Sequence, residues 1–180
     1  MKITKLKKVD NIIFKQYKNI TSNFKKSVIE RNFKVVERDW FKYDGKLYQI
    51  GKQNPDNIRL RPNNDKNVKL IARWLQNELG GKVFINPEPI SDPFRVSDFM
   101  YRNQKWELKT YSKENKKAVF NEINRGKGQA NNFIIDFSNS PLTYEEMLNQ
   151  VDYTFKRNHI NWFRKLIIKQ RNRYDVFIRQ

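Results

Sequence analysis

Apolar residues near the start of the chain recur at intervals of three and four, which is typical of one face of a helix. They are Leu6, Val9, Ile13, Tyr17, Ile20, Phe24 and Val28, and lysines occupy the other face. Farther along, Asp44-Gly45 separates two aromatic-rich runs, residues 38–43 and 46–50. Asp-Gly between such runs is a strong signal for a hairpin turn. We therefore expect a basic helix followed by a β-hairpin.

A second pattern begins after the polar segment 61–65. Asp65 can cap a helix over residues 66–79, which Gly80-Gly81 would end. Thr143 and Glu146 form a capping box for a later helix. The other expected elements are strands at residues 82–86, 97–102, 105–111, 133–137, 165–170 and 174–178, and a helix over residues 114–130.

The element order after residue 65 is αβββαβ, followed by αββ. We expect an α/β fold with a mixed sheet, in which residues 63–180 form the main domain with a C-terminal helix and hairpin. Residues 1–62 would form a separate basic arm of helix and hairpin. The apolar stripe of that helix would pack on its own domain or dock a partner protein.

The charge of the chain points to a polyanionic partner. It carries 37 Lys and Arg against 19 Asp and Glu, a net charge of +18 over 180 residues. Such an excess suits nucleic acid, RNA or DNA, or an anionic membrane surface. The chain has no cysteine and one histidine, His159, so thiolate metal sites and His-pair mechanisms are excluded. We see no membrane span and no signal peptide, and expect a cytoplasmic protein.

The residues with the clearest chemistry lie in the second and third strands of the αβββαβ segment. With a turn at Asn103-Gln104, Asp98 would lie opposite Lys109 and diagonal to Glu107. These three side chains would share one face. The other face would hold Phe99, Tyr101, Trp106 and Leu108 and would pack into the core.

Two carboxylates on one face can hold a hard divalent cation, Mg²⁺ or Mn²⁺. Asp98, Glu107 and the backbone carbonyl of Leu108 would be its ligands, with Glu78 as a further candidate. Lys109 would orient the attacking water and offset phosphate charge. The alternative is an ordinary surface ion pair between Asp98 and Lys109, and a solvated Glu78.

Basic residues after these strands would follow the phosphate backbone. They are Lys113, Lys116, Lys117, Arg125 and Lys127, with Gln129 either facing the site or exposed as a surface amide. Gly126 and Gly128 mark the end of the helix or a close approach of a phosphate backbone.

An αβββαβ order with Asp in the second strand and Glu-x-Lys in the third resembles the PD-(D/E)XK nuclease core. Residues 112–136 are similar to the C-terminal tRNase toxin domain of contact-dependent growth inhibition proteins, a kind of domain also found in prophage and mobile-element proteins. The resemblance implies a restriction-endonuclease-like fold and a metal-dependent nuclease with Asp98, Glu107 and Lys109 in the catalytic roles. It also implies RNA, including tRNA, as the favoured substrate, and an immunity protein as a partner. The alternative is a non-catalytic nucleic-acid-binding or virion-associated protein on a nuclease-like scaffold.

Overall fold

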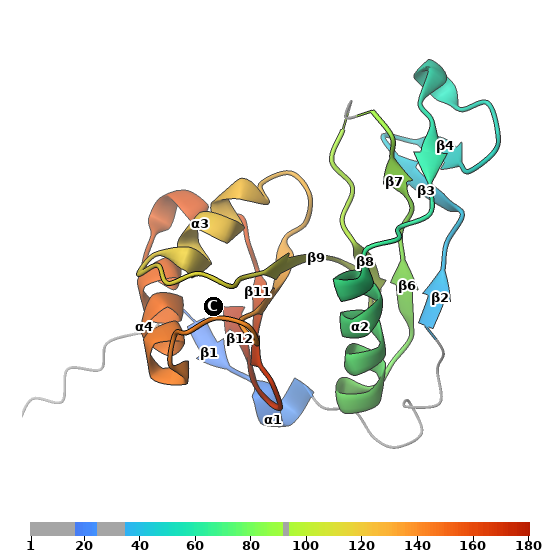
Figure 1. The fold of residues 1–180 in the computed structure, drawn as a ribbon. Coiled ribbons are helices and arrows are strands. Elements are labelled where there is room, and N and C mark those ends of the chain that lie inside the picture. Colours follow the sequence, from blue (N-terminus) through green and yellow to red (C-terminus); the bar gives the residue numbers. More distant parts are fainter. Residues whose placement is uncertain (1–16, 25–34, 92–93) are drawn as a thin grey trace, which may run out of the picture.

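A computed structural model describes residues 17–24, 35–91 and 94–180. Its centre is a mixed sheet of eight strands in the order β1-β12-β11-β10-β9-β8-β6-β2 (Figure 1). In chain order these strands are β1 (Tyr17–Asn19), β2 (Val35–Glu37), β6 (Val83–Ile85), β8 (Phe99–Tyr101), β9 (Gln104–Thr110), β10 (Asn132–Asp136), β11 (Lys165–Gln170) and β12 (Arg173–Arg179). Parallel pairing joins β9, β10 and β11, so the predicted α/β class with a mixed sheet is confirmed.

Helices cover both faces of this sheet. One face packs against α2 (Lys66–Trp74), which a π-helical turn, Leu75–Leu79, extends. The other packs against α3 (Ala118–Arg125) and α4 (Tyr144–Phe155) (Figure 1). Along β10, Phe133 and Ile135 join the α3–α4 core and Ile134 joins the α2 core, so this central strand is buried on both faces.

The helix starts follow the polar signals in the sequence. Asp65 caps α2, and its side chain accepts a hydrogen bond from the Asn67 backbone N–H at 2.7 Å. Thr143 and Glu146 form the predicted capping box of α4. These contacts satisfy backbone N–H groups that have no partner inside a helix. Both helix starts are therefore confirmed.

The predicted Asp-Gly hairpin forms a small sheet of its own. It joins β3 (Trp40–Tyr43) to β4 (Lys46–Gln49), and Asp44 and Gly45 have φ angles of 46° and 74°. Two positive φ angles are typical of the hairpin turn that Asp-Gly favours. The hairpin packs with β5 (Leu60–Arg61) and the loop after β7 (Glu88–Pro89) around a third core. Short 3₁₀ turns complete the described elements at Pro55–Asn57 and Asn158–Ile160.

The predicted N-terminal helix is wrong in the part that the structure describes. Tyr17–Asn19 is strand β1, antiparallel to β12, and only Thr21–Phe24 is helical, as α1. Tyr17 stacks on Phe155 of α4, with ring centroids 4.6 Å apart, and this tertiary contact outweighs the local helical spacing. The remainder of the predicted helix, with Lys5, Lys8, Lys15, Lys25 and Lys26, lies outside the described residues.

Two segments assigned by sequence to the arm are strands of the main sheet. β1 pairs with β12 at one edge, and β2 pairs in parallel with β6 at the other. The hairpin β3–β4, in contrast, pairs only with itself among the described residues. The division near residue 62 as a boundary between independently folding parts stays a prediction.

The β8–β9 hairpin has a different register from the predicted one. Its turn is at Arg102-Asn103, whose φ angles are 50° and 58°, and not at Asn103-Gln104. Phe99 pairs with Trp106 and Met100 with Lys105. Continuing this ladder by one residue brings Asp98 beside Glu107 and not beside Lys109. The physical reason lies in Arg102, which donates hydrogen bonds to the Phe24 and Leu79 carbonyls at 2.7 and 2.6 Å.

Helix α3 spans Ala118–Arg125 and not residues 114–130, so it begins later than predicted and the glycines end it earlier. Gly126 follows the last helical residue, and Gly128 has a φ of 87°. A Cβ at Gly126 would lie 2.3 Å from the Phe133 ring, so the end of α3 approaches β10 too closely for any side chain.

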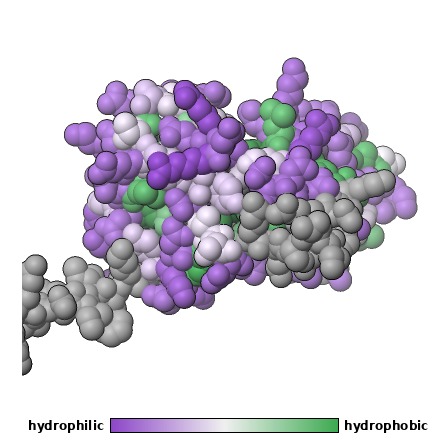
Figure 2. All heavy atoms as spheres, turned by 90° about the horizontal axis from the view of Figure 1, so that it is seen from below, coloured by the Kyte–Doolittle hydropathy of each residue, from purple (hydrophilic) through white to green (hydrophobic). Residues whose placement is uncertain are grey.

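The surface is mostly polar, as the mean hydropathy of −0.90 suggests. Figure 2 shows small apolar areas scattered among hydrophilic residues on the face that it presents. Among the helices of the described residues, none has the length and apolar character needed to cross a membrane.

Candidate active site

Four predicted site residues come together on the α3 side of the sheet. Asp98 lies just before β8, Glu107 and Lys109 lie on β9, and Gln129 lies in the loop between α3 and β10. Glu107 and Lys109 share a face because side chains two apart on a strand point the same way. Trp106 and Leu108 point to the opposite side and pack in the α2 core.

The Lys109 ammonium contacts both Glu107 on β9 and Gln129 in the loop after α3. Its Nζ lies 2.6 Å from Glu107 Oε1 and 3.3 Å from Gln129 Oε1. The Glu107 side chain is almost fully buried, while Lys109 keeps a fifth of its side chain exposed. A buried ion pair of this kind contributes little net stability, because desolvation offsets the attraction.

Asp98 is held against β9 by the backbone. Its Oδ2 accepts a hydrogen bond from the Leu108 N–H at 2.8 Å. Burial, and next the charge of Glu107, raise the pKa of Asp98 to about 7. Two carboxylates that repel each other in a desolvated place favour either a proton or a cation between them.

Glu107 is a buried carboxylate with one oxygen that has no hydrogen-bond partner among the described residues. It is 3% exposed, and burial raises its pKa even though the Lys109 ammonium and the Asp98 backbone N–H both act in the opposite direction. Its Oε2 is buried and forms no hydrogen bond with the described residues. Buried carboxylate oxygens without a partner are costly, so a divalent cation that coordinates Oε2 fits this donor set.

The Leu108 backbone can add a further oxygen. Since its N–H points to Asp98, its C=O points to the same side of β9, as the N–H and C=O of one strand residue do. The oxygens of Asp98 and Glu107 and the Leu108 carbonyl would then be the protein ligands. No cluster of three or more acidic or histidine side chains suited to a metal occurs in residues 17–24, 35–91 and 94–180, so backbone and water would complete the shell.

The structure does not bring Glu78 to this group. Glu78 is exposed in the turn that ends α2. The carboxylate from this helix that reaches Asp98 is Asp65, at the opposite end, whose charge contributes to the raised pKa of Asp98. Glu78 is thirteen positions after Asp65, which corresponds to about 20 Å along the helix.

The predicted nucleic-acid-binding residues fall into two places. Arg125, Lys127 and Gln129 lie at the C-terminal end of α3; Gln129 reaches the site through Lys109, and Arg125 pairs with Glu122. The other three, Lys113, Lys116 and Lys117, are exposed before the N-terminal end of α3. Lys116 and Lys117 line a different cleft, beside Tyr153 of α4.

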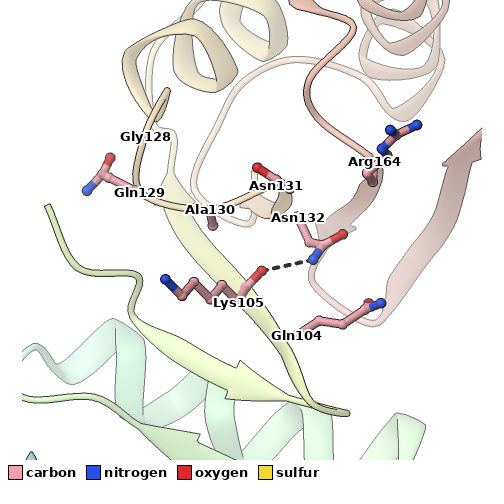
Figure 3. Close-up of a pocket in the computed structure, with 8 residues that line it drawn as sticks. All are labelled: Gln104, Lys105, Gly128, Gln129, Ala130, Asn131, Asn132 and Arg164. Carbon is pink, nitrogen blue, oxygen red and sulfur yellow. Dashed lines mark hydrogen bonds between the residues drawn. The ribbon is translucent and has the colours of Figure 1, made fainter. Parts of the chain in front are cut away.

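A cleft of about 380 Å³ opens beside Gln129. Figure 3 shows Lys105 of β9 and Gln129 extending on one side of it, and Gln104 and Arg164 on the other side. The loop that forms its wall is anchored by Asn132, whose Nδ2 donates to the Lys105 carbonyl at 2.9 Å. Lys105 shares the strand face of Glu107, so the cleft continues the row of site residues along β9.

Sequence reasoning missed Arg95, Lys105 and Arg164. The Arg95 guanidinium donates to the Arg125 carbonyl at 2.5 Å, and its charge acts to lower the pKa of Glu107. The alternation along β9 was the available signal for Lys105, because positions 105, 107 and 109 share one face. Nothing in the local sequence indicated Arg164, since its backbone reaches the cleft through a hydrogen bond from its N–H to the Asn131 carbonyl at 2.6 Å.

This geometry lies within a segment that resembles a known toxin domain. Residues 95–173 match the family model of the contact-dependent growth inhibition CdiA C-terminal domain. The match includes Asp98, Glu107, Lys109 and Gln129. The chain therefore contains a segment similar to the toxin domains of contact-dependent growth inhibition.

Two further comparisons complete the picture. The CdiA-CT/CdiI toxin and immunity complex from Burkholderia pseudomallei is a solved structure with 18% sequence identity and a TM-score of 0.43 to this chain. That match covers 72% of this chain and 97% of the other. No curated protein matches this chain.

Proposed function

We propose that this protein is a metal-dependent endonuclease toxin of the PD-(D/E)XK type. The observation that carries the proposal is the Glu107 carboxylate, buried with one unpaired oxygen beside the partly buried Asp98. Structural carboxylates are rarely left in this condition, whereas perturbed pairs of acids are typical of functional sites.

Each residue has a chemical task in this proposal. Asp98, Glu107 and the Leu108 carbonyl would hold Mg²⁺ or Mn²⁺. The bound cation would lower the pKa of a water and stabilise negative charge on the phosphate. Lys109, held between Glu107 and Gln129, would orient the attacking water and balance charge in the transition state. Arg125 and Lys127 would hold the phosphates on either side of the cleaved bond.

RNA, including tRNA, is the proposed substrate class, with cytoplasm as the place of action. The support for RNA is the resemblance to tRNase toxin domains. A toxin of this kind needs a neutralising partner in the cell that makes it. The net charge of +18 favours an acidic immunity protein that would cover the basic residues around the cleft.

The test is cleavage by purified protein. Total RNA and plasmid DNA are incubated separately with Mg²⁺, with Mn²⁺ or with EDTA, and the products are separated by electrophoresis. We expect cleavage of RNA with either metal and none with EDTA. Metal-independent cleavage, or no cleavage of either nucleic acid, would contradict the proposal.

Matched variants separate this site from a contaminating nuclease. Glu107→Gln keeps the size of the buried side chain and removes its charge, and should lower the cleavage rate about 100-fold or more. Glu114→Gln makes the same change at an exposed carboxylate outside the site. Its rate should equal that of the unmodified protein.

A further inference from the structure

A second, smaller pocket lies next to the carboxylates, under the β3–β4 hairpin. Its volume is about 170 Å³. Aromatic residues of β3 form one wall, and Asn86, Arg95 and Lys105 form part of the rest. None of these wall residues was assigned a role by the sequence.

Two aromatic rings at this pocket are exposed. Trp40 is 39% exposed and Tyr43 is 40% exposed, whereas most of the other aromatic residues that the structure describes are buried. The Tyr43 ring stacks on Phe94 with centroids 4.4 Å apart and an angle of 9°. The Arg38 guanidinium lies 5.0 Å from the centre of the Trp40 ring. Exposed rings that are held in place beside cations are the usual platforms for unpaired nucleobases.

Asn86 adds a hydrogen-bonding group to this pocket. It is 4% exposed, and its Nδ2 donates to the Ser97 carbonyl at 2.8 Å. Its Oδ1 is buried and accepts no hydrogen bond from the described residues. An unpaired acceptor of this kind favours a ligand with a donor group. The exocyclic amino group of adenine, cytosine or guanine is such a donor.

The pocket is connected to the proposed catalytic residues. The Asn86 N–H donates to the Asp98 carbonyl at 3.0 Å. Lys105 lines both this pocket and the cleft beside Gln129, and it shares the face of Glu107 two residues away, about 7 Å along the strand. Arg95 lines the pocket and its charge reaches Glu107. A strand bound in the cleft could therefore place a nearby base in the pocket.

We propose that this pocket binds one unpaired, amino-bearing nucleobase of the substrate strand, stacked on Trp40. The inference rests on the proposed function, and it narrows the substrate to single-stranded or looped nucleic acid. In a duplex, each base stacks on its neighbours, so its faces are not available to the Trp40 ring.

The test measures binding without cleavage. The full chain is titrated in EDTA with short labelled oligomers of A, C and U, as RNA and as DNA, and with the matching duplex. Binding is followed by anisotropy and by tryptophan fluorescence, which stacking on Trp40 should quench. We expect the single-stranded A and C oligomers to bind several-fold tighter than U oligomers or the duplex. Equal affinity for all of them would overturn the proposal.

Variants of the exposed ring assign the effect to the pocket. Trp40→Leu should weaken binding of the A oligomer about tenfold and abolish the quenching. Trp40→Phe should keep most of the affinity, because it keeps an aromatic face. Leu70→Ala, at an exposed position on α2, should bind like the unmodified protein. If Trp40→Leu binds as tightly as Trp40→Phe, the pocket is not the base site.

The two proposals fail in different ways. If the protein binds oligomers through Trp40 but cleaves no nucleic acid, the nuclease proposal fails and the base-pocket proposal stands. If Trp40→Leu cleaves nucleic acid with the same KM as the unmodified protein, the base-pocket proposal fails and the nuclease proposal stands. Unchanged fluorescence of the unmodified protein at saturating oligomer would also overturn stacking on Trp40, without any variant.

Discussion

The Asp98 carboxylate accepts a 2.8 Å hydrogen bond from the backbone N–H of Leu108, the residue between Glu107 and Lys109. This bond joins the segment before β8 to the middle of β9, so the two acids are positioned by backbone as well as by side-chain contacts. It also brings Asp98 close to Glu107 in a partly desolvated place, which is why burial and then the Glu107 charge raise the pKa of Asp98 to about 7.

The raised pKa of Asp98 predicts how stability depends on pH without metal. The ordinary pKa of Asp is about 3.9, so between about pH 4 and pH 7 the folded protein binds more protons than the unfolded chain. The free energy of unfolding should therefore fall as pH rises through this window. Asp98→Asn cannot ionise and should gain stability relative to the unmodified protein as pH rises. Urea unfolding of both proteins in EDTA, at about pH 4.5 and about pH 7.5, measures this.

A divalent cation should restore, at neutral pH, the stability that ionisation of Asp98 costs the metal-free protein. Mg²⁺ or Mn²⁺ would bind the two ionised acids and offset their repulsion, and should raise the melting temperature of the unmodified protein but not of Asp98→Asn or Glu107→Gln. A stability difference between Asp98→Asn and the unmodified protein that is the same at both pH values would contradict the assigned environment of Asp98.

Lys105 and Lys109 lie on the same face of β9, but we expect Lys109 to act in catalysis and Lys105 to act in binding nucleic acid. Lys109 contacts Glu107 and Gln129, whereas Lys105 is exposed between the two pockets. Lys109→Met should lower kcat about 100-fold or more, with little change in affinity for nucleic acid. Lys105→Met should weaken binding and leave kcat nearly unchanged. Single-turnover cleavage and binding in EDTA separate the two effects, and equal losses of kcat would disprove the distinction.

The shared face of Asp98, Glu107 and Lys109 could be predicted even though their pairing could not. Moving a two-residue turn by one position shifts the register by two, and a shift of two keeps every side chain on its own face. The position of the turn itself depends on Arg102, which adopts a φ of 50° while its guanidinium binds carbonyls of Phe24 and Leu79. Those partners are distant in sequence, so no local pattern indicates them.

Helix caps and the Asp-Gly turn were predictable because each depends on residues close together in the chain. The edge strands β1 and β2 were not, since they depend on pairing with β12 and β6. The same holds for the cations around the site. Arg95 and Arg164 reach it through loops whose path is set by hydrogen bonds to Arg125 and Asn131.

The cations that line the cleft and the adjoining pocket predict a salt dependence of nucleic-acid binding, to which the lysines before α3 should contribute less. Replacing Arg95, Lys105 and Arg164 together by Ala should reduce the slope of log affinity against log salt concentration by about two to three. Replacing Lys113, Lys116 and Lys117 by Ala makes the same change in net charge at the other end of α3. We expect a smaller reduction there. An equal reduction for both triple variants would show that binding follows the overall charge and not the cleft.

Because the end of α3 lies so close to β10, we expect a side chain at residue 126 to clash with Phe133, and a smaller residue at 133 to relieve the clash. Gly126→Ala places a Cβ 2.3 Å from the Phe133 ring and should destabilise the fold by about 1–3 kcal/mol. Phe133→Leu in addition should recover part of that loss, although it is itself destabilising, because the ring is no longer in contact with residue 126. Denaturant unfolding of the two single variants and the double variant measures the coupling. Additive losses would show that the contact is not the cause.

The Asp44-Gly45 turn offers a test of whether the β3–β4 hairpin folds apart from the main sheet. Gly45 has a φ of 74°, a conformation that a β-branched residue adopts only with strain. The hairpin packs in its own core, around Phe41 and Tyr48, and not in the two cores of the eight-stranded sheet. Gly45→Val should therefore increase amide hydrogen exchange in β3 and β4 and leave the protection of β9, β10 and β11 unchanged. Because Trp40 lies on β3, the same variant should bind single-stranded oligomers more weakly while keeping its metal-dependent rise in melting temperature. Loss of protection throughout the eight-stranded sheet would instead show that the hairpin and the sheet fold as one unit.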